Sequence, residues 1–152
     1  MQIPRCNLDS KLNWKPHITY VRQKFRDNCP KVFPLIARNS KMSLENKVLI
    51  YTAILRPALT YASPIWVYAV KIYFQQIDSS QNIILRKISR ARWFMRNEDI
   101  RHALKIPPIK EFIKNIAKSF FGNLTNIDNS AIKDLDFYRP DLNTRRPRAI
   151  LL

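Results

Sequence analysis

The feature that most constrains this chain is its glycine content: Gly122 is the single glycine among 152 residues. Average usage of about 7% would supply roughly 11. The glycine-rich loops that hold phosphates in dinucleotide-binding and P-loop proteins need several glycines and are therefore excluded. All-β folds with tight turns also depend on glycine to reach positive φ. The sequence therefore predicts a mainly helical protein without a nucleotide-binding loop.

Charge gives the first indication of a partner. The chain carries 27 Lys and Arg against 11 Asp and Glu, a net charge of +16, and its 46% of hydrophobic residues suffices for a folded core. Residues 1–42 carry a net +7 and residues 84–118 also +7, whereas residues 43–83 carry only +1. We call these the first basic segment, the second basic segment and the apolar middle. Such a surplus suits a polyanion, nucleic acid first and an anionic membrane surface second, although basic composition can also serve solubility alone.

Apolar spacing and capping residues predict one helix after another. The predicted helices run from about His17 through Asn28, from Leu44 to about Leu55, from Val70 to Trp93, from Asn97 through Leu104 and from Ile109 to Leu124. We therefore predict an all-α helical bundle of about five helices, followed by a basic, loosely ordered tail.

Details of these helices are also predicted. Pro30 should kink or end the first helix, and Ser43 and Asn97 should act as N-caps. Two adjoining stripes should form the buried seam of the long helix: Ile77, Ile84 and Ala91, and Phe74, Gln81 and Ile88. The apolar side chains expected to be buried in the second helix are Val48, Leu49, Ala53 and Leu55.

Cysteines and hydrophobic runs place the chain inside the cell. Cys6 and Cys29 could form one disulfide at most, and no secretory signal precedes them, which favours an intracellular, reduced protein in the nucleus or cytoplasm. The longest uncharged run lies between Arg56 and Lys71 and is shorter than the ~20 residues that a spanning helix needs. We therefore expect no membrane span.

Signatures of catalysis are missing. Nucleotidyl transfer needs clustered carboxylates that hold divalent metals, but the close pairs here are Glu98 with Asp99 and Asp134 with Asp136. The first pair is typical of a helix start and the second of a solvated surface. His17 and His102 have no nucleophile near them in the sequence. We expect no catalytic residue, no metal ligand and no cofactor in this chain.

Binding chemistry is better represented, in the second basic segment. The candidate nucleic-acid-binding residues are Arg86, Lys87, Arg90, Arg92, Arg96 and Arg101. Arg86 and Arg90 would share a helix face and could follow a row of phosphates. The aromatic residues among them could stack on bases, but Trp93 is expected in the core, as are Trp14, Trp66, Tyr51 and Tyr61. A solvated basic face is the alternative for the arginines.

Several segments resemble one known family. The segments are Leu8–Ile18, Lys47–Pro57, Leu59–Trp66, Leu85–Ile88, Trp93–Asn97 and Ile106–Ile113. They resemble, in the same order, the region that follows the palm in jockey-type non-LTR (LINE-like) retrotransposon reverse transcriptases. No single segment would suffice, but their collinear order is specific. The sequence departs from the family pattern at residues 3–7, at Cys29-Pro30 and at Arg92.

The resemblance implies an RNA-directed DNA polymerase whose thumb grips a template–primer duplex. It implies that residues 1–15 are a remnant of the palm–thumb junction, residues 16–127 a helical thumb and connection domain, and residues 128–152 a basic tail. Palm, fingers and the magnesium-binding catalytic motif should lie upstream. The expected chain is thus a fragment that binds RNA or RNA–DNA duplex but has no polymerase activity of its own. Two alternatives stay open: an interaction protein that uses an exposed apolar middle, and an unrelated basic RNA-binding protein.

Overall fold

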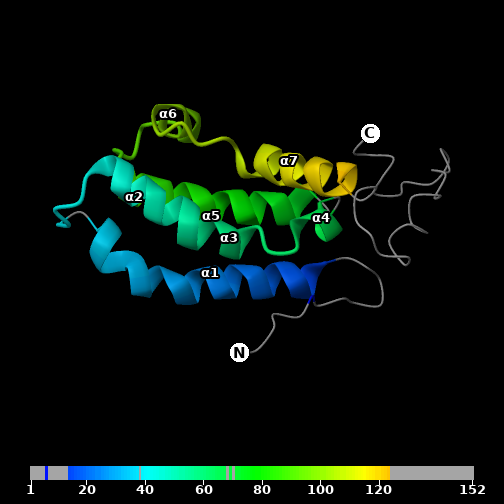
Figure 1. The fold of residues 1–152 in the computed structure, drawn as a ribbon. Coiled ribbons are helices and arrows are strands. Elements are labelled where there is room, and N and C mark those ends of the chain that lie inside the picture. The colour runs from blue at the N-terminus through cyan, green and yellow to red at the C-terminus, as the bar shows by residue number, and fades with distance from the viewer. Residues whose placement is uncertain (1–5, 7–13, 38, 68, 70, 124–152) are drawn as a thin grey trace, which may run out of the picture. The chain divides into compact units, whose positions relative to one another are not determined.

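The computed structural model describes residue 6 and residues 14–37, 39–67, 69 and 71–123. Every regular element in this part of the chain is helical, which confirms the predicted all-α class (Figure 1). The elements are α1 (Lys15–Ile36), α2 (Leu44–Ile50), the π-helix η1 (Tyr51–Leu55), α3 (Arg56–Leu59), α4 (Ser63–Trp66), α5 (Lys71–Ser89), α6 (Asn97–Ala103) and α7 (Ile109–Gly122). None of the helices in the described ranges is long and apolar enough to cross a membrane.

These elements form two compact units. The first unit takes the chain up to Tyr61 and Ala69–Lys110, and the second takes the short stretch that starts at Ala62 and the chain from Glu111 onward. In the first unit, α1 packs against α3 and α5, while α2 and α6 both pack against α5 (Figure 1). Helix α5 is therefore the central element of the first unit.

Helix α1 continues through its prolines and does not end at Pro30. Both Pro30 and Pro34 lie inside the helix and both are exposed. A proline removes one backbone hydrogen bond, and the carbonyl oxygen it leaves is tolerated where water can reach it. Burial of Val32 and Ile36 on the opposite side, at 5% and 0% exposure, holds the last turns against the core.

Helix α2 begins as predicted, because the Ser43 hydroxyl accepts a hydrogen bond from the Asn46 amide at 3.3 Å. Its buried residues differ from the prediction, however. Leu55 is fully buried, but Leu49 is 64% exposed. Ala53 is also exposed and Val48 is half-buried.

The reason is the wide turn η1, in which hydrogen bonds run from residue i to i+5. A turn of this kind holds more residues than the roughly 3.6 of an α-helix, so side chains four positions apart stay on the same, buried side of the helix. They form one buried line, which consists of Lys47, Tyr51, Leu55 and Leu59.

The seam of α5 is buried as predicted at Phe74, Ile77, Gln81, Ile84 and Ile88. The prediction is wrong for Ala91, which lies beyond the end of the helix at Ser89 and is only half-buried. Gln81 is fully buried, and both ends of its amide are used.

The hydroxyl of Tyr51 donates to Gln81 Oε1 at 2.9 Å, and Gln81 Nε2 donates to the carbonyl of Pro107 at 3.3 Å. Burial raises the pKa of Tyr51, so its hydroxyl stays protonated and remains a donor. This chain of bonds links η1, α5 and the segment after α6.

Positive φ is supplied by residues other than glycine. Among the described residues, Trp14, Ala62, Arg90 and Lys105 have φ between 54° and 63°, whereas Gly122 does not have a positive φ. For residues with a Cβ this conformation costs about 1–2 kcal/mol each. The shortage of glycine thus does not remove left-handed positions from this chain but places larger side chains in them.

The second unit holds α4 and most of α7. Trp66 is fully buried, and in α7 the same is true of Ile113 and Ala117, while Phe120 is 46% exposed. Helix α7 begins at Ile109, directly after Pro108, as predicted. The predicted end at Leu124 and the predicted tail lie outside the described residues.

Candidate nucleic-acid interface

The candidate site is the connection between α5 and α6, residues 90–96. The predicted helix to Trp93 is wrong at its end: α5 stops at Ser89, and Arg90 turns the chain with φ 55°. The amide of Ala91 donates to the carbonyl of Arg86 at 3.2 Å, which is the bond of a Schellman helix end. The chain then leaves the helix axis, so Arg90 does not continue the row of basic residues on α5.

A tight turn follows, and it carries two aromatic side chains. The amide of Met95 donates to the carbonyl of Arg92 at 3.1 Å, so Trp93 and Phe94 are the two central residues of a β-turn. Their rings lie 5.9 Å apart at an interplanar angle of 86°, in edge-to-face contact. We call residues 92–95 the aromatic turn.

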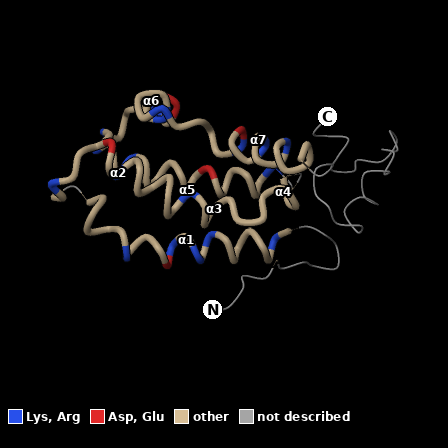
Figure 2. The backbone as a smooth tube through the Cα atoms, viewed as in Figure 1, with Lys and Arg blue, Asp and Glu red and all other residues tan. Residues whose placement is uncertain are grey.

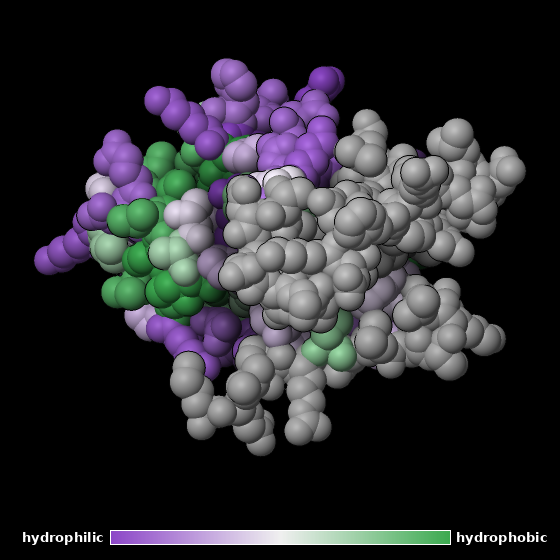
Figure 3. Space-filling view, turned by 45° about the vertical axis from the view of Figure 1, so that its right-hand side comes forward, coloured by the Kyte–Doolittle hydropathy of each residue, from purple (hydrophilic) through white to green (hydrophobic). Residues whose placement is uncertain are grey.

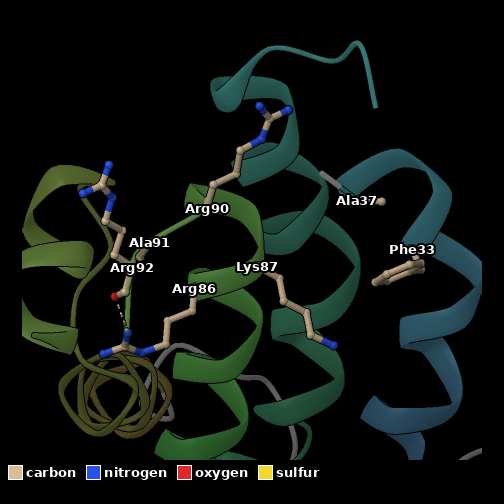
Figure 4. A pocket seen from close by; sticks show the side chains of 7 residues that line it. All are labelled: Phe33, Ala37, Arg86, Lys87, Arg90, Ala91 and Arg92. Carbon is tan, nitrogen blue, oxygen red and sulfur yellow. Dashed lines mark hydrogen bonds between the residues drawn. The ribbon is translucent and has the colours of Figure 1, made fainter. Parts of the chain in front are cut away.

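Arg86 holds the aromatic turn from α5. Its Nε donates to Asn97 Oδ1 at 2.8 Å and its Nη1 to the carbonyl of Arg92 at 3.2 Å. Its Nη2 donates to the carbonyl of Met95. One guanidinium group therefore binds both ends of the turn and the first residue of α6. Figure 4 shows its bond to the carbonyl of Arg92. Asn97 was predicted as an N-cap, but Arg96 occupies that position and the Asn97 side chain accepts from Arg86 instead.

The tip of the turn is exposed. Trp93 is 90% exposed and Phe94 is 61% exposed, so the prediction that Trp93 lies in the core is wrong. Trp14, Trp66 and Tyr51 are buried as predicted, whereas Tyr61 is half-buried. The difference is local. The buried aromatic residues lie on helices or at a helix start that packs on the core, but Trp93 follows a helix end that turns the chain away.

The other basic candidates point in different directions. Figure 4 shows Lys87 leaving α5 toward α1, opposite to Arg86. The Lys87 ammonium lies 5.6 Å from the centre of the Phe33 ring. Arg90, Arg92 and Arg96 are exposed at the ends of the aromatic turn. These last three arginines, together with Trp93 and Phe94, form one local cluster.

Arg101 is placed differently. Its Nη1 donates to Asn82 Oδ1 at 2.8 Å and lies 3.9 Å from an oxygen of Asp78. Both partners are on α5, so Arg101 fastens α6 to α5. Its guanidinium is partly engaged within the fold, as is that of Arg86.

A groove lies beside this cluster in the first unit. It has a volume of about 530 Å³ and its walls come from α1, from the end of α5 and from the connection that follows (Figure 4). Its lining residues are Phe33, Ala37, Arg86, Lys87, Arg90, Ala91 and Arg92. An open groove with four basic residues on its wall could receive a phosphate backbone.

No cluster of three potential metal ligands occurs within the part of the chain that the structure describes. His17 is fully buried and its Nε2 lies 3.3 Å from the Tyr61 carbonyl. Burial lowers the pKa of His17, and the bond to the Tyr61 carbonyl opposes this shift in part. Glu98 and Asp99 lie in the first turn of α6, as predicted, whereas Asp134 and Asp136 are not among the described residues.

The amino-acid sequence is similar to those of several RNA-directed DNA polymerases of mobile elements. The chain is 38% identical over 128 residues to the "RNA-directed DNA polymerase from mobile element jockey" of Drosophila funebris and, equally, to that of Drosophila melanogaster. It is 32% identical over 146 residues to the "Probable RNA-directed DNA polymerase from transposon X-element" of Drosophila melanogaster. These alignments cover 84% of this chain for the jockey proteins and 95% for the X-element protein.

The chain is therefore homologous, over most of its length, to a segment of the RNA-directed DNA polymerases of non-LTR retrotransposons. It spans about a seventh of the length of these relatives, 14% of each jockey protein and 16% of the X-element protein. No family model and no solved structure matches the chain.

Proposed function

We propose that this chain is the thumb and connection segment of a non-LTR retrotransposon reverse transcriptase and that it binds RNA or RNA–DNA duplex through phosphate contacts. Residues 16–127 would be the helical thumb and connection domain, with the palm–thumb junction before it and a basic tail after it. Palm and fingers of the polymerase would be its partners within the longer protein. Homology to polymerase segments supports this assignment, and the helical fold is compatible with it.

One observation carries the binding proposal: Arg90, Arg92 and Arg96 are exposed within seven residues of each other, next to an open groove with Lys87 on its wall. Guanidinium groups bind phosphate oxygens through paired N–H donors and stay charged at every physiological pH. Such contacts hold any sequence, because they reach the backbone and not the bases. Arg86 would act by positioning the turn and not by contacting phosphates itself.

A salt titration tests this proposal. Binding of the full chain to an RNA–DNA duplex is measured by filter binding between 50 and 300 mM salt. Each phosphate contact contributes a slope of about −0.7 to −0.9 to the plot of log K against log salt concentration. We expect a slope of about −3 or steeper. A flat plot would contradict the proposed duplex binding.

A second function is favoured by the apolar middle. Leu49, Ile72 and Ile83 are 64%, 54% and 58% exposed. Figure 3 shows hydrophobic surface between hydrophilic areas on the visible face. In a chain that spans a small part of its relatives, such side chains fit packing against the rest of a polymerase. Size-exclusion chromatography with light scattering tests whether these exposed side chains form a packing surface. Self-association of the chain that Leu49→Gln abolishes would support this second function, and a monomer at high concentration would contradict it.

A further inference from the structure

The most unusual side chain of the described part of the molecule is Trp93. It is 90% exposed, whereas the other two tryptophans, Trp14 and Trp66, are 4% and 0% exposed. A tryptophan buries on the order of 150–250 Å² when it is packed, so leaving it in water forgoes a large apolar gain. Phe94 stands beside it, 61% exposed. Two large rings in water at the tip of one turn indicate a surface that is completed by a ligand.

The backbone beneath these rings is well fastened. Arg86 donates to the carbonyl oxygens of Arg92 and Met95, the two ends of the turn, and to Asn97 at the start of α6. Arg86 itself projects from α5, whose seam is buried. The rings are therefore presented on a backbone that is held before any ligand arrives, which lowers the entropy lost on binding.

The surroundings of the rings decide what kind of ligand fits. Arg90 and Arg92 precede the rings in the chain and Arg96 follows them, and all three are exposed. An apolar peptide would have to desolvate these cations without compensation, which disfavours it. A nucleotide offers both halves of the match, since its base has a π face for stacking and its phosphate is an anion for the arginines.

The base must also be accessible. Inside a duplex both faces of a base are covered by its neighbours, so a protruding pair of rings cannot stack there without unstacking the duplex, at a cost of about a few kcal/mol per step. An unpaired base exposes its face at no such cost. The rings thus favour a strand with unpaired bases over a continuous duplex.

We propose that the aromatic turn is a stacking site for unpaired nucleobases: Trp93 and Phe94 stack on one or more bases of a single strand, and Arg90, Arg92 and Arg96 contact its phosphates. This inference rests on the proposed nucleic-acid binding and adds to it the class of strand that the site takes. Unpaired bases occur both in a free single strand and in an overhang next to a duplex, and the experiment includes both.

Trp93 provides its own probe. Because the other two tryptophans are buried, the accessible tryptophan fluorescence of the chain comes from Trp93. Acrylamide quenching is measured with a 12-nucleotide single strand, a blunt 12-base-pair duplex, and the same duplex with a six-nucleotide 3′ overhang. We expect the single strand and the overhang to quench the emission and protect it from acrylamide, and the blunt duplex to do so much less.

Variants give the second measurement. Trp93→Leu and Phe94→Leu keep apolar bulk but remove the stacking face, and both side chains are exposed, so the fold should persist by circular dichroism. Loss of a stacked base weakens binding by roughly 5- to 150-fold. We expect this loss for the labelled single strand, measured by fluorescence anisotropy, and less than about a two-fold change for the blunt duplex.

Phe120→Leu is the matched control. Phe120 is 46% exposed and makes an edge-to-face contact with Phe121 at 5.4 Å, but it lies on α7. We expect no change in binding to any strand from this variant.

The outcomes separate the two proposals. A steep salt dependence with unchanged single-strand affinity in Trp93→Leu overturns the stacking site and leaves phosphate binding intact. Equal losses on single strand and blunt duplex overturn the preference for unpaired bases. Absence of binding to every nucleic acid contradicts both proposals.

Discussion

The two basic segments carry the same net charge, +7 each, yet the structure uses them differently. In the first segment, those basic residues that belong to α1 are spread along the helix (Figure 2). Three exposed ones have polar partners on the same helix: Lys24 with Tyr20 at 3.2 Å, Arg26 with Gln23 at 2.8 Å, and Lys31 with Asn28 at 3.1 Å.

In the second segment, three exposed arginines lie within seven residues around two exposed rings. An equal net charge is thus dispersed along the helix where the first basic segment forms α1, whereas in the second basic segment part of it is concentrated between residues 90 and 96. The net charge of a segment indicates only that a polyanionic ligand is favoured. Where the exposed arginines come close enough to bind it together depends on where the helix ends.

The largest expected difference concerns nucleic-acid binding. The triple variant Arg90→Gln, Arg92→Gln, Arg96→Gln should weaken binding of a single strand at least about ten-fold and make the salt slope about 2 to 3 units shallower, because three phosphate contacts are lost. Anisotropy titrations at several salt concentrations measure both quantities.

The matched variant on α1 changes Lys24, Arg26 and Lys31 to Gln. It removes the same charge, and we expect it to weaken binding only about three-fold or less, because those residues are dispersed and have partners on their own helix. Equal losses in the two triples would mean that net charge alone governs binding.

The second largest expected difference between the aromatic turn and α1 concerns the free energy of unfolding. Arg86→Gln removes three hydrogen bonds that hold the aromatic turn, and we expect it to lower the free energy of unfolding by about 1–2 kcal/mol, since the group is partly exposed. Arg26→Gln on α1 should change it by less than about 0.5 kcal/mol. Urea denaturation followed by circular dichroism measures both, and similar values for the two variants would argue against a structural role for Arg86.

Glycine substitutions at the residues that follow the helices should change the free energy of unfolding by a smaller amount than Arg86→Gln, and at the positions with positive φ they should raise it. Helix α1 is followed by Ala37 with φ −60°, whereas α5 is followed by Arg90 with φ 55°. Glycine relieves strain only where φ is positive, so Lys105→Gly and Arg90→Gly should each raise the free energy of unfolding by about 0.5–1 kcal/mol. Ala37→Gly should lower it by a similar amount, through greater freedom of the unfolded chain. The same denaturation experiment would contradict this account if Lys105→Gly were destabilising.

The smallest expected effect is a pH dependence that belongs to α1. Burial holds the pKa of His17 below its usual 6.5. Below about pH 6.5 the unfolded chain therefore binds a proton more readily than the folded one, and stability falls until the pH reaches the lower folded pKa. Thermal unfolding between pH 7.5 and 5 should show a decrease that His17→Gln removes; an unchanged decrease in that variant would assign it to other groups.

Much of the fold could be predicted from the sequence, because helical spacing and capping act locally. The buried seam of α5 and the Ser43 cap follow from residues a few positions apart, and the structure has both. The continuation of α1 beyond Pro30 could not be predicted from local sequence. The burial of Val32 and Ile36 against the core is a tertiary effect, and it outweighs the tendency of proline to break a helix.

The aromatic turn could not be predicted in the same way. Spacing alone continues the helical pattern to Trp93, and glycine, the usual sign of a helix end, is absent from positions 86–96. An arginine takes the left-handed position instead, so the usual signal is missing. The flanking of two aromatic residues by arginines on both sides was the available sign that this segment is exposed.

The wide turn η1 has a consequence for length variation. On an ideal α-helix, the buried positions 47, 51, 55 and 59 would drift by about 120° around the axis, at about 100° per residue. Removing one residue between 51 and 55 would bring the same four side chains to within about 60° of each other on a regular helix. Ala53 is exposed in this segment, so its deletion would cost little contact with the core. Residues 51–55 thus behave as a one-residue insertion absorbed by the helix, and homologous chains one residue shorter there could keep the same buried line with an ordinary α-helix.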